Sequence, residues 1–151
     1  MAPACLSAGF AAHVPLRMPD GSSRVYYMGG NGPHSGARNS SFALATLPAD
    51  RFAGVVAGPG SAQIAAVTQR ALNITGGQII VTVDVSAGGS FCVGVEASAR
   101  FGRSLPVMAS GTDIAVRFPG EPGGLSLDLI GQQHRLVVFA DDVTVYTLGF
   151  R

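Results

Sequence analysis

The feature that most constrains the fold is a period-two alternation of apolar and polar residues in the second half of the sequence. Ile79, Val81, Val83 and Val85 fall on one side of an extended chain, whereas Thr82 and Asp84 fall on the other. This period is typical of half-buried β-strands. It recurs in four further segments: Phe91 to Val95, Ile114 to Phe118, Leu125 to Leu129, and a last hairpin formed by Arg135 to Phe139 and Val143 to Phe150.

Turn signals separate these predicted strands. We expect Ala87-Gly88-Gly89 and Ala140-Asp141-Asp142 to form hairpin-type turns, because Gly and Asp are frequent in tight turns. Short strands at this spacing, joined by glycine-rich turns, predict an all-β domain, namely an antiparallel, jelly-roll-like β-sandwich spanning residues 55–151.

The first 54 residues predict a smaller β segment. Apolar runs at Phe10 to Leu16, Arg24 to Met28 and Phe42 to Leu47 indicate three strands, and Asp20-Gly21 is a turn signal between the first two. The sequence therefore predicts a three-stranded, blade-like antiparallel meander before the sandwich.

A long polar loop rich in Gly, Asn, Pro and Ser separates the second and third of these strands. It carries Asn31, His34 and Arg38, and Tyr27 precedes it. One interpretation is a packed turn in which Arg38 bonds loop carbonyls. The other is a ligand site, because Asn and Arg offer several directed hydrogen bonds to sugar hydroxyls and Tyr27 can stack on a ring. The candidate ligand-binding residues are Asn31, His34, Arg38 and Tyr27.

Several motifs around this loop resemble a known family. They are Tyr26-Tyr27, Gly29-Gly30-Asn31-Gly32-Pro33-His34, Gly36, Arg38, Leu44-Ala45-Thr46-Leu47 and Phe52-Ala53-Gly54. Together they resemble the last propeller blade of glycosidase-like proteins related to glycoside hydrolase families 32 and 43, in which a β-sandwich follows the propeller. The resemblance implies that the loop opens on the sugar-binding face and that the catalytic carboxylates belong to earlier blades. It also favours a strand over a helix for Gln63 to Leu72, where periodicity alone allows either.

Composition and charge exclude several function classes. The formal net charge is +1 and all basic residues are scattered Arg, so no basic stripe indicates nucleic acid. No apolar run reaches the roughly 18 residues that suggest a membrane span, and the apolar segment Met1 to Ala12 is not expected to be a signal peptide, because it lacks a basic start and a clear cleavage site. Cys5 and Cys92 do not define a disulfide framework. His13, His34 and His134 are too scattered to predict a metal site, and no cofactor is expected.

A glycosidase needs two carboxylates across the scissile bond, and no such pair is evident among the seven Asp and two Glu. We therefore expect no catalysis by the chain alone. The leading hypothesis is a non-catalytic β-sandwich module of glycosidase-like ancestry with a structural or assembly role or weak carbohydrate binding, its partners being a carbohydrate, further copies of itself or another chain. The alternatives are a C-terminal piece or subunit of a glycoside hydrolase acting on fructan- or sucrose-type glycosides, and a free-standing all-β protein.

Overall fold

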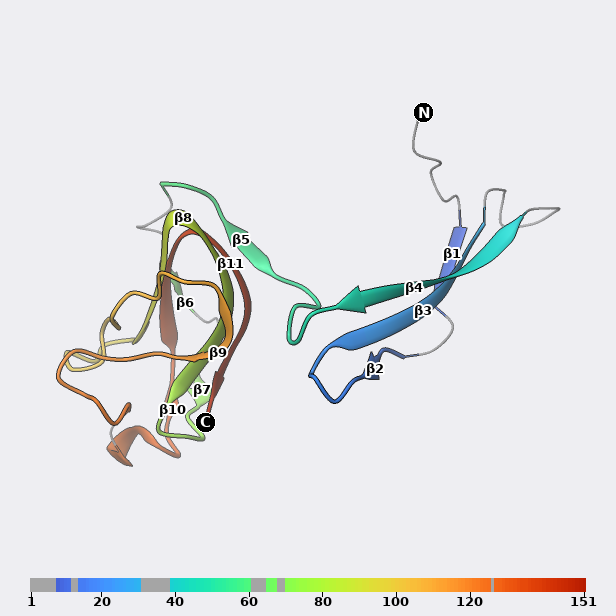
Figure 1. The fold of residues 1–151 in the computed structure, drawn as a ribbon. Coiled ribbons are helices and arrows are strands. Elements are labelled where there is room, and N and C mark those ends of the chain that lie inside the picture. The colour runs from blue at the N-terminus through green and yellow to red at the C-terminus, as the bar shows by residue number, and fades with distance from the viewer. Residues whose placement is uncertain (1–7, 12–13, 31–38, 61–64, 68–69, 126) are drawn as a thin grey trace. The chain divides into compact units, whose positions relative to one another are not determined.

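The computed structural model describes residues 8–11, 14–30, 39–60, 65–67, 70–125 and 127–151. The chain divides into two compact units, Met1–Phe52 and Ala53–Arg151. All pairings between the described strands are antiparallel, and the only described helix is a single short 3-10 turn, so the expectation of an all-β chain is confirmed (Figure 1).

The first unit is one sheet built around β3 (Ser23–Gly30). One edge of β3 pairs with β1 (Ala8–Ala11) and, further along, with β2 (Leu16–Arg17), while the other edge pairs with β4 (Ser40–Leu47). The sheet is thus the expected three-stranded meander, with its first strand in two pieces. The expected turn at Asp20-Gly21 is present: Gly21 has a φ of 81°, and the Ser22 amide donates to the Asp20 carboxylate at 2.9 Å.

The second unit is organised by two long strands, β8 (Ile79–Val95) and β11 (Leu136–Phe150), which pair from Leu136↔Val95 to Phe150↔Ile79. β9 (Gly111–Ala115) borders β8, whereas β5 (Val55–Ala57) and β6 (Ala65–Val67) border β11 at different levels. A separate two-stranded pair joins β7 (Leu72–Asn73) to β10 (Gln133–His134). The strand interpretation of Gln63 to Leu72 holds for the described β6.

The prediction of two hairpin turns in this unit was wrong. Ala87-Gly88-Gly89 and Ala140-Asp141-Asp142 lie in bends inside the continuous strands β8 and β11. Pairing runs through the bend, from Ser90↔Asp141 to Val85↔Val143, with a shift in register between them. Gly88 at φ 86° and Asp142 at φ 47° provide the left-handed conformations that bend the two strands at one level. Gly and Asp suit a bulge as well as they suit a turn, which is why local sequence predicted the wrong feature.

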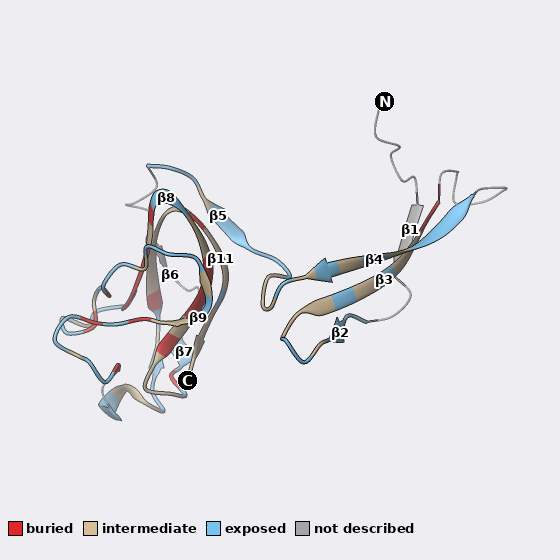
Figure 2. Ribbon diagram, viewed as in Figure 1, coloured by how far each residue is buried: buried red, intermediate tan, exposed pale blue. Residues whose placement is uncertain are grey.

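The bend lets the two halves of the β8–β11 ribbon share a core, which makes the unit sandwich-like (Figures 1 and 2). Most of the alternating residues predicted for the inner face are fully or almost fully buried, while Val85, next to the bend, is only partly buried. The buried ones from β8 are Ile79, Val81, Val83, Phe91, Val93 and Val95. The rings of Phe101 and Phe118 meet edge to face at 5.3 Å between centroids at one side of this core.

Two polar side chains are buried with the core. The Ser104 hydroxyl accepts from the Val93 amide at 3.0 Å, and the Thr82 hydroxyl accepts from the Asp113 amide at 3.2 Å. Thr82 faces away from the inner residues, as its position in the alternation predicts, and bonds the irregular part of β9 that contains Asp113. The first bond holds the segment around Ser104 against β8, because its loss would leave the buried Val93 amide unsatisfied. The second bond joins β8 to β9.

The strand expected at Leu125 to Leu129 was also wrong. A 3-10 helix, η1 (Leu127–Leu129), occupies this place, after a turn in which Gly124 has a φ of 94°. Leu125 is buried, Leu129 packs on the core and Leu127 is exposed. The strand predicted from Ile114 to Phe118 ends early, since β9 stops at Ala115 before Pro119-Gly120, although Val116 and Phe118 are buried as the alternation requires.

Candidate functional site

The candidate residues of the polar loop, Asn31, His34 and Arg38, lie outside the described part of the chain. Tyr27 is described. It lies on β3 opposite Ala43 and is half-buried, on the same face of the sheet as Val25. Its neighbour Tyr26 points to the opposite face and is exposed. The structure therefore separates the two tyrosines that precede the loop.

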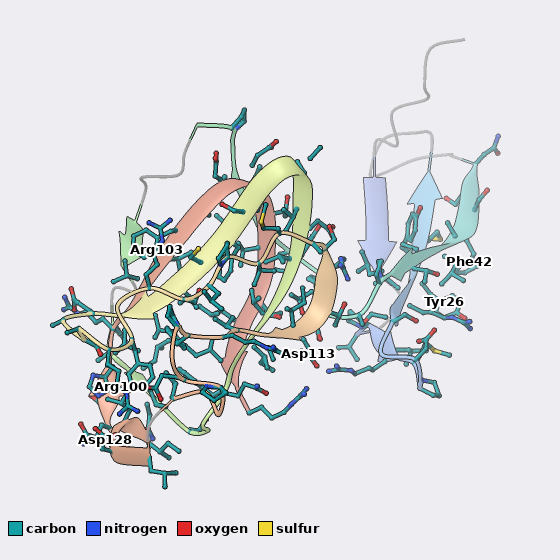
Figure 3. All side chains as sticks on the ribbon, turned by 60° about the vertical axis from the view of Figure 1, so that its left-hand side comes forward. Tyr26, Phe42, Arg100, Arg103, Asp113 and Asp128 are labelled. Carbon is teal, nitrogen blue, oxygen red and sulfur yellow. The ribbon has the colours of Figure 1, made fainter. Side chains whose placement is uncertain are left out.

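The face that carries Tyr26 is an apolar surface that the described strands of its own unit do not cover, and we call it the β3–β4 face. Tyr26 pairs with Leu44 and Met28 pairs with Phe42, while Leu16 of β2 lies opposite Arg24 on the same face. Phe42 is 83% exposed, and Leu16, Tyr26 and Leu44 are also exposed. Figure 3 shows Tyr26 and Phe42 on this sheet. Side chains of this size are the ones a folded protein usually covers.

The sequence predicted binding residues in the loop and did not single out the residues of the β3–β4 face. A signal was present in the strand itself. In β4 the larger residues Phe42, Leu44 and Thr46 alternate with the small residues Ala43 and Ala45. An alternation of large against small residues indicates two faces with different contacts, even when neither face is charged.

A second apolar surface lies in the other unit, where β5 borders β11. It is a groove of about 450 Å³. No charged side chain lines it; the lining residues are Val55, Val56, Ala57, Gly58, Val138, Ala140, Val145, Tyr146, Thr147 and Leu148. Val55 and Val56 are both exposed. Tyr146 is fixed at this groove, because its hydroxyl donates to Asp84 at 2.8 Å.

Several of the acidic side chains form ion pairs or hydrogen bonds within the fold. Asp50 pairs with Arg17 at 3.4 Å, Asp113 pairs with Arg151 at 3.3 Å, and Glu121 accepts from the guanidinium of Arg100. The hydroxyl and amide of Ser22 both bond the Asp20 carboxylate and lower its pKa, while Asp84 is bound by Tyr146. These five of the nine acidic residues are engaged by a neighbouring side chain or turn.

No group of three or more His, Cys, Asp or Glu side chains with the proximity of a metal site occurs among the described residues. Cys92 is a free, buried thiol. The Nε2 atom of His134 is buried without a hydrogen-bond partner in the described structure. No helix in the described ranges is long and apolar enough to span a bilayer.

Comparison of the chain with models of protein families, with characterised proteins and with solved structures finds no match. Two features of the described residues bear on function. One is the pair of apolar β surfaces, one on each unit, and the other is the set of carboxylates that bond turn residues or pair with Arg.

Proposed function

We propose that this chain is a non-catalytic β module that works by assembly, and that the β3–β4 face is an association surface. The observation that carries the proposal is the exposure of Leu16, Tyr26, Phe42 and Leu44 on one face of one sheet. Burying one such side chain fully contributes about 1.5–3 kcal/mol. Several of them together supply the driving force that a stable sheet-on-sheet contact needs.

The resemblance to a propeller blade supports the same proposal by a separate route. In a whole propeller, each blade packs its faces against the neighbouring blades. A single blade therefore exposes apolar residues that the neighbouring blades would bury. The partners that fit are a second copy of this chain or another chain presenting a sheet. The engagement of the carboxylates favours this role over hydrolysis by the chain alone, because a catalytic acid must be available to its substrate.

Phe42→Lys tests the proposal. Lysine at the most exposed position of the face places a charge in the contact, so we expect self-association to weaken when the purified chain is examined by sedimentation velocity at rising concentration. The matched control is Leu127→Lys, since Leu127 is 84% exposed and lies in η1 of the other unit. Identical sedimentation of the wild-type and Phe42→Lys chains at every concentration would show that the β3–β4 face does not bind a second copy of the chain.

Weak carbohydrate binding is a second candidate, favoured by Tyr26 and Arg24. Both are exposed and lie on the same face, two residues apart on β3. An aromatic ring and a guanidinium are a combination that suits a sugar, because the ring stacks on its apolar face and the guanidinium bonds its hydroxyls. The alternative of a glycoside hydrolase subunit belongs to the same ancestry. It requires a partner chain that supplies the catalytic carboxylates.

A titration with fructan or sucrose separates these candidates. Carbohydrate binding predicts chemical-shift changes at Tyr26 or in the loop of Asn31, His34 and Arg38. Assembly alone predicts none there. For the subunit hypothesis, hydrolysis should appear only when a partner chain is added.

A further inference from the structure

The outer edge of β11 is covered over only part of its length. β6 pairs with Val137 to Phe139, and β5 pairs with Val143 to Val145. After a register shift at Val145/Thr147, β11 continues to Phe150 with β8 on its other side. From Thr147 to Phe150 no described strand pairs with the outer edge.

The hydrogen bonds at the end of β11 show which groups face outward. The backbones of Gln78 and Arg151 exchange both of their bonds, at 3.0 and 2.8 Å. Because such pairs alternate along an antiparallel ladder, Gly149 also bonds toward β8. The intervening residues, Leu148 and Phe150, point their N–H and C=O groups away from β8. The open edge therefore offers two donors and two acceptors in a row.

We propose that this open edge pairs with the same edge of a second copy of the chain, antiparallel, about a two-fold axis at Gly149. Leu148 of each copy then lies opposite Phe150 of the other, and their outward groups form four backbone hydrogen bonds. The two five-stranded sheets become one continuous sheet. The interface is isologous, as a two-fold axis requires. It lies on the second unit and does not depend on the β3–β4 face proposed above.

Gly149 is the residue that suits this partner. Gly149 of one copy would lie opposite Gly149 of the other as a non-hydrogen-bonded pair, with Cα atoms only about 4.5 Å apart. A Cβ atom at Gly149 would meet only the Ile80 Cγ1 atom within its own chain, at 3.9 Å. The fold of a single copy thus leaves room for a side chain at this position, and glycine leaves the backbone there open to the approach of a second strand.

Charge also favours a second copy over a charged partner. Exposed strand edges are usually protected by Lys or other charged residues, or by Pro. The segment from Val143 to Phe150 contains none of these, and the neighbouring groove has no charged side chain. The nearest charge, Arg151, is paired with Asp113 in its own chain at 3.3 Å. Two copies of this edge therefore meet without bringing unpaired charges together.

A disulfide tests the predicted two-fold axis. Gly149→Cys in the full chain, with Cys5→Ser to leave buried Cys92 as the only other thiol, should form a covalent dimer on mild oxidation, since a Cα separation of about 4.5 Å is within disulfide range. The control is Leu127→Cys, an exposed position away from the sheet. Cross-linking of Gly149→Cys no greater than that of Leu127→Cys would overturn the proposal.

Gly149→Lys tests the same contact without a covalent cross-link. Two lysines facing each other at the axis should raise the dimer dissociation constant roughly tenfold or more, with the melting temperature of the dilute chain unchanged. Gly149→Ala, which adds no charge, should keep most of the dimer. An unchanged dissociation constant for Gly149→Lys, or pairing of this edge with an unrelated extended peptide in place of a second copy, would contradict the inference.

Discussion

Three aspartates have left-handed backbone conformations: Asp50 at φ 56°, Asp113 at φ 52° and Asp142 at φ 47°. Outside glycine, Asp and Asn adopt this region most readily, because their short polar side chains can bond the local backbone. Asp50 lies in a turn after β4, whereas Asp142 lies in the bend of β11, where the sequence predicted a hairpin turn. The sequence could not assign the partner of Asp113, which is the distant Arg151.

The pair of Arg100 and Glu121 gives a prediction at the residue scale. Arg100 donates to both carboxylate oxygens of Glu121, with Nη2 to Oε2 at 2.7 Å, and this hydrogen bonding is the main reason that the pKa of Glu121 lies below its ordinary value. A lowered folded-state pKa means that the contribution of the pair to stability is present above the unfolded pKa and is lost as pH falls through the folded pKa. The Arg100 side chain is more than half exposed, so solvent screens the pair and its effect on stability is small.

Removal of the guanidinium should therefore raise the pKa of Glu121. We expect this in Arg100→Gln, measured by NMR titration of the side-chain carboxyl. Arg17→Gln is the control, because Arg17 pairs with Asp50 in the other unit. A Glu121 pKa that does not move in Arg100→Gln would show that the pair does not form in solution.

At the scale of elements, the alternation of apolar residues predicted the strands, but it did not predict how they continue. Ala87-Gly88-Gly89 and Ala140-Asp141-Asp142 have the composition of turns, yet each lies within one strand. The reason is that the two irregularities fall opposite each other in the ribbon, so the bend of one strand accommodates the bend of the other. This pairing is non-local, and a sequence read segment by segment does not contain it.

Gly54 gives the prediction for the entry into β5. A Cβ atom there would lie 2.7 Å from the Thr144 Cγ2 atom and 2.9 Å from the ring of Tyr146. We therefore expect Gly54→Ala to destabilise the second unit by about 1–3 kcal/mol, the usual cost of overpacking. Gly58→Ala is the matched control, since a Cβ atom at Gly58 has no neighbour within 4 Å. Urea unfolding compares the stability of the two variants. Equal unfolding midpoints would show that the backbone at Gly54 does not lie so close to Thr144 and Tyr146.

At the scale of the whole molecule, each unit has a β surface that its own described strands do not cover. The first unit presents the β3–β4 face, with Phe42 and Tyr26, and the second presents the edge of β11 at Leu148 to Phe150. The sequence predicted association with further copies or another chain, but it did not single out the residues of either surface, because the exposure of a side chain is a property of the finished sheet. The sequence-based candidates Asn31, His34 and Arg38 stay predictions, since they fall outside the described residues.

Sedimentation velocity of four proteins is the most direct test of the claim that the chain assembles through these two surfaces. The proteins are the wild type, Phe42→Lys, Gly149→Lys and the double variant, each at rising concentration. If both surfaces associate, the wild type should form species larger than a dimer, each single variant should stop at a dimer, and the double variant should remain a monomer. A wild-type chain that stays monomeric at every concentration, or a double variant that assembles as the wild type does, would contradict the account.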